Sequence, residues 1–146
     1  MDIGVSFQVP NEHGFVLNRI LRCISANDLL WKITDDEVFV KSHPFPLQGL
    51  YNWDELIEKL PQVESYVVFC MLKAYSETEN KIETLEQFLE GSCELAIFII
   101  DVTEVELYCK SKYKLTRIAD ELSREFDIKV LIINTENCTR NSWIEY

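Results

Sequence analysis

The chain has 146 residues, enough for one domain, and its 47% hydrophobic and 27% charged residues are typical of a folded globular protein. Only four Gly and four Pro argue against long low-complexity linkers. The 14 basic and 25 acidic residues give a net charge of −11, which argues against nucleic acid as a partner, because nucleic-acid binders concentrate positive charge.

Alternating and helical patterns predict the elements of the first half of the chain. These are a strand at 3–9, a helix at 17–24, strands at 30–34 and 37–41, and a loop at 42–51 that contains two Pro and a Gly. We expect the two middle strands to form a hairpin around the turn-prone pair Asp35 and Asp36.

The second half predicts three helices and four strands. In chain order they are a helix at 53–60, a strand at 66–75, a helix at 84–90, strands at 95–100 and 104–110, a helix at 111–126 and a buried strand at 128–133. The sequence therefore predicts a single α+β domain, 1–146. It has a mixed sheet of about seven strands and four helices, in the order β-α-β-β-α-β-α-β-β-α-β. Strands 66–75 and 95–100 are apolar on both faces, which predicts cover on both sides of the sheet. The strand order stays open.

The terminus and the cysteines indicate a cytoplasmic protein. The first residues lack the basic and apolar regions of a signal peptide. The longest apolar runs fall well short of the roughly 18–20 residues that cross a bilayer, so no membrane contact is expected. The five cysteines have no Cys-x-x-Cys spacing and are expected to be reduced, buried thiols. Neither they nor His13 and His43 have zinc-ligand spacing, so no metal or cofactor is expected.

Several segments resemble a known protein family. They are Gly4–Asn11, Leu72–Tyr75, Glu86–Leu89 with Cys93–Leu95, and Val105–Lys110 with Thr139 and Arg140. The resemblance covers the whole chain and is to a domain-of-unknown-function family of small cytoplasmic proteins from Bacillus-type bacteria. It implies one cytoplasmic domain, and it supplies no catalytic residue, ligand or partner. Residues 35–62 match that family least well.

The sequence contains no catalytic signature. A Cys or Ser nucleophile needs a base, usually His, and neither His13 nor His43 adjoins a nucleophile motif. There is no Gly-rich phosphate loop. The ends of buried strands, where open sheets place their sites, offer Tyr75, Asp101 and Asn134. We therefore assign no catalytic residue and expect a non-catalytic protein, while an enzyme stays an open alternative.

The acidic charge is concentrated in the middle of the chain. Residues 61–110 hold 3 basic and 10 acidic residues, a net charge of −7. Glu83, Glu86 and Glu90 fall on one stripe of the predicted third helix, opposite its apolar side. The stripe is either a solvated helix face or a docking surface for a basic protein, as in an immunity or antitoxin-like pair. Docking of a basic protein partner is the leading functional hypothesis.

A basic cluster supplies the alternative hypothesis. Lys110, Lys112, Lys114 and Arg117 lie at the start of the last predicted helix, where cations oppose the helix dipole. A helix N-terminus presents N–H groups to anions, so the chain could be a small enzyme or sensor that binds an anionic metabolite there. The cluster could equally be a solvated helix end. It could also meet the acidic stripe of a second copy, so a homo-oligomer stays open.

Overall fold

The computed structural model describes residues 1–76, 82–140 and 143. Its elements are β1 (Asp2–Gln8), α1 (Val16–Ile24), β2 (Leu30–Val40), β3 (His43–Pro44), β4 (Gly49–Tyr51), α2 (Trp53–Lys59), β5 (Tyr66–Tyr75), α3 (Leu85–Glu90), β6 (Cys93–Ile100), β7 (Glu104–Cys109), α4 (Lys112–Phe126) and β8 (Leu131–Asn134). The predicted α+β class, with four helices and one sheet, is confirmed for the described part of the chain.

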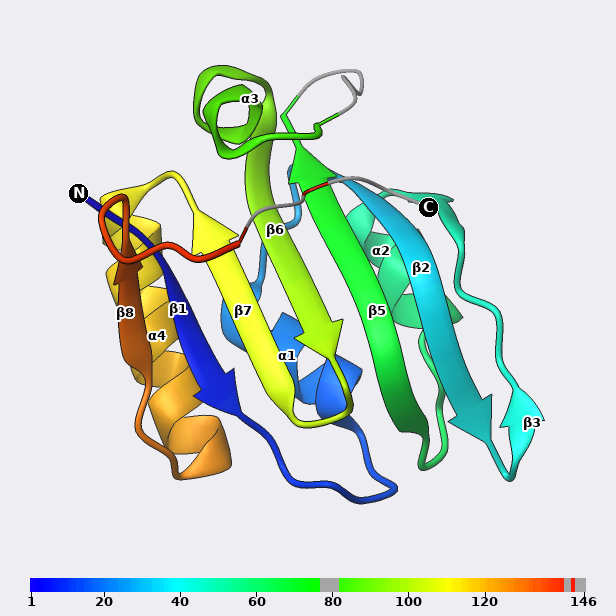
Figure 1. Ribbon diagram of the computed structural model, residues 1–146. Coiled ribbons are helices and arrows are strands. Elements are labelled where there is room, and N and C mark those ends of the chain that lie inside the picture. The colour runs from blue at the N-terminus through cyan, green and yellow to red at the C-terminus, as the bar shows by residue number, and fades with distance from the viewer. Residues whose placement is uncertain (77–81, 141–142, 144–146) are drawn as a thin grey trace.

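The strands form one sheet in the order β3-β2-β5-β6-β7-β1-β8, with β4 also paired to β2 (Figure 1). Every described pair of neighbours is antiparallel, where a mixed sheet was expected, and there are eight strands instead of about seven. The parallel strand pair that a mixed sheet requires is prevented by the position of β1. Helix α4 connects β7 to β8, but β1 lies between these two strands and runs opposite to both.

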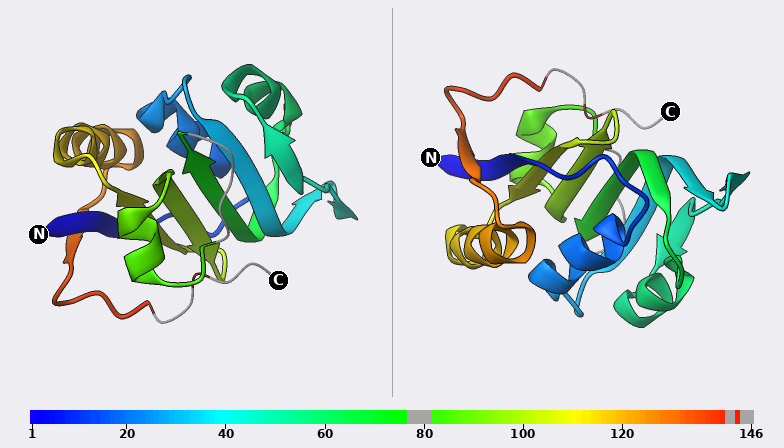
Figure 2. Two further views of the ribbon diagram at one scale, coloured as in Figure 1. Left: turned by 90° about the horizontal axis from the view of Figure 1, so that it is seen from above. Right: turned by 90° about the horizontal axis from the view of Figure 1, so that it is seen from below.

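The sheet is covered on both faces, as the apolar strands predicted (Figure 2). One side, which we call the helix face, packs against α1, α2 and α4 and includes Trp31, Leu72 and Ile97 in its core. Helix α3 lies on the opposite side, where a smaller aromatic cluster contains Phe98 and Tyr108. Alternate residues of β5, β6 and β7 feed the two cores, because successive side chains of a strand point to opposite faces. None of the described helices has the length and apolar character to cross a membrane.

The predicted hairpin around Asp35 is wrong. β2 is one strand of 11 residues, and both of its halves pair with β5. The register shifts between Thr34 and Glu37, where Asp35 has a φ of 49°. Turn-prone residues fit a β-bulge within a strand as readily as they fit a hairpin turn. The Asp pair therefore forms a bulge, and the strand continues beyond it. Asp36 accepts a hydrogen bond from the Leu47 backbone N–H at 2.7 Å. The expected loop after β2 therefore folds back as β3 and β4 along its outer edge.

β8 lies at the edge of the sheet, and it is shorter and more exposed than the predicted buried strand. Leu131 and Ile132 are 55% and 46% exposed. The side-chain amide of Asn137 covers the outer edge: its Oδ1 accepts from the Asn134 N–H at 2.7 Å, and its Nδ2 donates to the Ile132 carbonyl at 3.2 Å. In turn, Asn134 Oδ1 accepts from the Glu136 and Asn137 N–H groups, both at 2.9 Å.

Candidate functional site

The described residues that follow β8 lie on the side of the sheet opposite the helix face (Figure 1). We call residues 138–140 and 143 the strap, and this side of the sheet the strap face. Trp143 is fully buried there, with its ring centroid 4.9 Å from that of Phe88 and 4.6 Å from that of Tyr108. Lys73, buried near the end of β5, donates from Nζ to the Trp143 carbonyl at 2.7 Å. The strap is thus anchored through an aromatic cluster built by β6, β7 and α3.

A second anchor joins the strap to β7. Arg140 donates from Nε and from one terminal nitrogen to the two carboxylate oxygens of Glu106, at 3.0 and 3.1 Å. Its guanidinium also lies 3.8 Å from the ring centroid of Phe98. Such a two-pronged contact fixes the orientation of both groups as well as their separation. Both side chains are mostly withdrawn from water, being 13% exposed in Arg140 and 27% in Glu106.

The same carboxylate is bonded to a tyrosine. Tyr108 donates its hydroxyl hydrogen to Glu106 Oε1 at 2.5 Å. Burial by itself raises the pKa of the Glu106 carboxyl. The hydrogen bonds from Arg140 and Tyr108 and the charge of Arg140 outweigh burial, so this pKa lies below its ordinary value of 4.5. Burial, together with the bond to Glu106, raises the pKa of Tyr108 above 10.0. At neutral pH the arrangement is therefore an ionised carboxylate held by a cation and a neutral phenol.

A groove of about 480 Å³ lies beside the strap over β7, β1 and β8. Its polar lining consists of Ser6, Glu104, Glu106, Tyr108, Asn137 and Thr139. The exposed carboxylate of Glu104 accepts from Gln8 Nε2 at 2.8 Å. Arg140 already pairs with Glu106 beside this groove. The exposed Glu104 carboxylate, with hydroxyl and amide groups around it, suits an ammonium or guanidinium group better than an anion.

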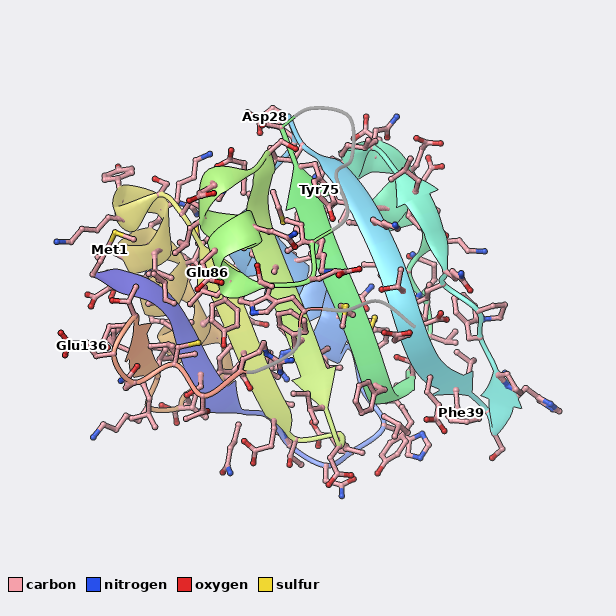
Figure 3. All side chains as sticks on the ribbon, turned by 45° about the horizontal axis from the view of Figure 1, so that its top comes forward. Met1, Asp28, Phe39, Tyr75, Glu86 and Glu136 are labelled. Atoms are coloured by element: carbon pink, nitrogen blue, oxygen red, sulfur yellow. The ribbon has the colours of Figure 1, made fainter. Side chains whose placement is uncertain are left out.

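The predicted acidic stripe is only partly helical. α3 begins after the N-cap Thr84, so Glu83 precedes the helix, whereas Glu86 and Glu90 lie on it and are exposed. Glu86 is labelled on this helix in Figure 3. Thr84 and Gln87 form a capping box at the start of this helix. Because α3 covers the strap face, the structure places Glu86 and Glu90 on the same side of the molecule as the groove.

The four residues of the basic cluster are not brought together on one site. Lys110 donates from Nζ to the Gly91 carbonyl at the end of α3 and lies 5.3 Å from the Phe88 ring centroid. Arg117 instead donates to the Ile24 carbonyl at 2.8 Å, at the end of α1 on the opposite face. Lys112 and Lys114 are exposed in the first turn of α4. Two of the four cations thus bind the ends of different helices, where positive charge is favourable.

The cysteine environments disfavour thiolate chemistry. All five cysteines are free, and four of them are buried. Burial raises the pKa of Cys23 to about 11 and that of Cys93 to about 12. Cys138, half-buried in the strap, places its Sγ 3.8 Å from the Tyr108 hydroxyl. No cluster of three or more metal-binding side chains occurs within the described residues.

Comparison with known proteins settles the family. Residues 2–144 match a family described as "Protein of unknown function (DUF2691)". The chain belongs to that family. It is also similar to "Uncharacterized protein YncE" of Bacillus subtilis (strain 168), with 33% identity over 151 residues that cover 97% of this chain and 98% of that protein. The resemblance found in the sequence is thus confirmed, and this DUF2691 member has a bacterial relative of nearly equal extent. No solved structure matches.

Sequence reasoning did not find the central contact of the site in this DUF2691 chain. Glu106 and Arg140 lie 34 positions apart, and no spacing rule connects them. One signal was present: Glu104 and Glu106 alternate with the apolar residues of β7, which marks one face of that strand as polar. For Trp143 the sequence offers only one signal, an apolar side chain in the mostly polar stretch 134–146.

Proposed function

We propose that this protein is a non-catalytic binding protein that docks a basic protein partner on its strap face. The observation that supports the proposal is that α3, which carries Glu86 and Glu90, lies on the same face of the sheet as Glu104 of β7. All three side chains are exposed, and all belong to elements of this face. Of the cations nearby, Lys110 binds the Gly91 carbonyl and Arg140 binds Glu106. The exposed charged side chains of α3 and β7 are thus all acidic, and they would attract a basic surface before contact.

The test removes charge at nearly constant shape. The variant Glu83→Gln, Glu86→Gln, Glu90→Gln is compared with wild type in association kinetics. The partner is one captured by affinity purification from the native cell at low and high salt. We expect association to slow several-fold at low salt and to depend less on salt, since peripheral charges act mainly on the on-rate. Stability should hold or rise by about 0.2–0.5 kcal/mol, because the Glu86–Glu90 repulsion along α3 is removed.

A matched control carries the same change in net charge elsewhere. Glu58, Glu64 and Asp120 are exposed acidic residues outside α3 and β7. The variant Glu58→Gln, Glu64→Gln, Asp120→Asn should associate at close to the wild-type rate. Equal effects of the two variants would mean that only total charge matters, and an unchanged rate in the α3 variant would remove the docking proposal.

The proposal includes a cytoplasmic location and is weighed against one alternative function, the binding of an anionic metabolite. The free, mostly buried cysteines support a cytoplasmic protein, because reducing compartments keep thiols unpaired. Binding of an anionic metabolite at the start of α4 has less support, since Lys110 and Arg117 already bind backbone carbonyls of different helices. Stabilisation by inorganic phosphate that is lost on changing Lys112 and Lys114 to Gln would favour that alternative instead.

A further inference from the structure

We propose that the strap face recognises a peptide segment with an arginine followed, three residues later, by a tryptophan, and that the strap occupies this surface until such a segment of the partner displaces it. The inference rests on the proposed function and adds the partner's chemistry to it. The contacts of the strap show which side chains this surface binds. Its two anchors, Arg140 and Trp143, have this spacing.

The first anchor position is selective for guanidinium. Both oxygens of Glu106 are engaged by Arg140, at 3.0 and 3.1 Å, and the guanidinium lies 3.8 Å from the Phe98 ring centroid. A planar, forked donor can meet a carboxylate with two bonds and still stack on a ring. An ammonium group makes only a point contact. The position therefore favours arginine over lysine.

The second anchor position is a closed aromatic site. Trp143 stacks on Phe88 at 4.9 Å and meets Phe98 edge-on at 5.2 Å. Together with the carbonyl that Lys73 binds, these contacts fix both the ring and the backbone of the residue in this position. Large aromatic residues supply most of the binding free energy in small interfaces, which makes this position the principal anchor.

Three observations indicate that the strap can be exchanged. Its residues belong to no helix or strand, so no ladder of backbone hydrogen bonds holds it to the sheet. The Trp143 indole N–H is buried with no acceptor among the described residues, which lowers the stability of the closed state. The groove beside the strap remains open, and the Glu104 carboxylate in it is exposed. A partner segment with one more basic residue would therefore gain a contact that the strap lacks.

The test uses the full chain and a synthetic peptide with the sequence of residues 136–146, in which Cys138→Ser removes the peptide's own thiol. The rate at which a thiol reagent labels Cys138 reports opening of the strap, because this half-buried residue belongs to it. The peptide must compete with a tethered segment whose effective concentration is on the order of 1 mM, so labelling is followed up to several times that concentration. We expect the peptide to accelerate Cys138 labelling at least threefold.

Two peptide controls separate recognition from general effects. The peptide carrying Arg140→Ala and Trp143→Ala should leave the labelling rate unchanged, and the Arg140→Lys peptide should act several-fold more weakly. Equal labelling with and without the native-sequence peptide, or equal action of all three peptides, would overturn the proposal.

Variants of the chain give a second readout. Changing Glu106→Gln should speed Cys138 labelling in the absence of peptide and abolish the preference for the arginine peptide over the lysine peptide, whereas Glu58→Gln should change neither. If the peptides fail while the α3 variant still slows partner association, this inference falls and the docking proposal stands. If the peptides act but the α3 variant associates normally, the docking proposal falls.

Discussion

The Arg140–Glu106 pair allows a quantitative test of what holds the strap to the sheet. The perturbation is a double-mutant cycle: Arg140→Ala, Glu106→Ala and both together, each compared with wild type in free energy of unfolding. Phe98 is unchanged in all four proteins. The contact between Arg140 and this ring is lost both with and without Glu106, so it cancels in the cycle and the coupling reports the ion pair.

The expected coupling follows from geometry and exposure. Two unit charges about 4 Å apart attract by about 4 kcal/mol at an effective dielectric constant near 20. Exposed pairs retain only about 0.2–1 kcal/mol, whereas breaking a buried pair costs about 3–5 kcal/mol. With side-chain exposures of 13% and 27% and two parallel hydrogen bonds, the Arg140–Glu106 pair lies between these limits. We expect a coupling of about 2 kcal/mol at neutral pH, a value between those of exposed and buried pairs.

The pH dependence gives the coupling a distinct signature. The pKa of the Glu106 carboxyl is lower in the folded state than its ordinary value of 4.5. Its contribution to stability is therefore fully present above that value and is lost as the pH falls through the lower, folded-state pKa. Urea unfolding of the four proteins, repeated from neutral pH down to about pH 3, measures this. A coupling below about 0.5 kcal/mol, the level of exposed pairs, or one that does not change with pH, would refute the reasoning.

Two further predictions concern the core. Replacing the fully buried Ile99 with Ala should lower the free energy of unfolding by roughly 2–5 kcal/mol, and a wild-type urea midpoint would contradict its central position. Among the thiols of the folded protein, Cys138 should react with a labelling reagent well before Cys70 and Cys109, because burial raises the pKa of both latter groups and shields them. Labelling of Cys70 at the rate of Cys138 would show that the core opens readily.

The fold was predictable where one signal decided the structure. The stripe at Leu17, Ile20 and Leu21 could only be a buried helix side, and all three residues are buried on α1. At Asp35, by contrast, the same turn preference fits a hairpin or a bulge. The choice depends on pairing with β5, which lies more than thirty residues further along the chain. The strap face could not be predicted for the same reason, since its central contact joins residues that only the folded sheet brings together.

The Asn137 amide on β8 has a consequence for self-association. A strand at the end of a sheet, with Leu131 and Ile132 exposed, is a template on which another chain can add a strand and start a fibre. Asn137 satisfies one outward N–H and one outward carbonyl of that template. Its turn is held by Asn134 through local hydrogen bonds that do not involve the strap. Opening the strap face to a partner would therefore leave this terminal strand protected, so that exchange of the strap does not begin polymerisation.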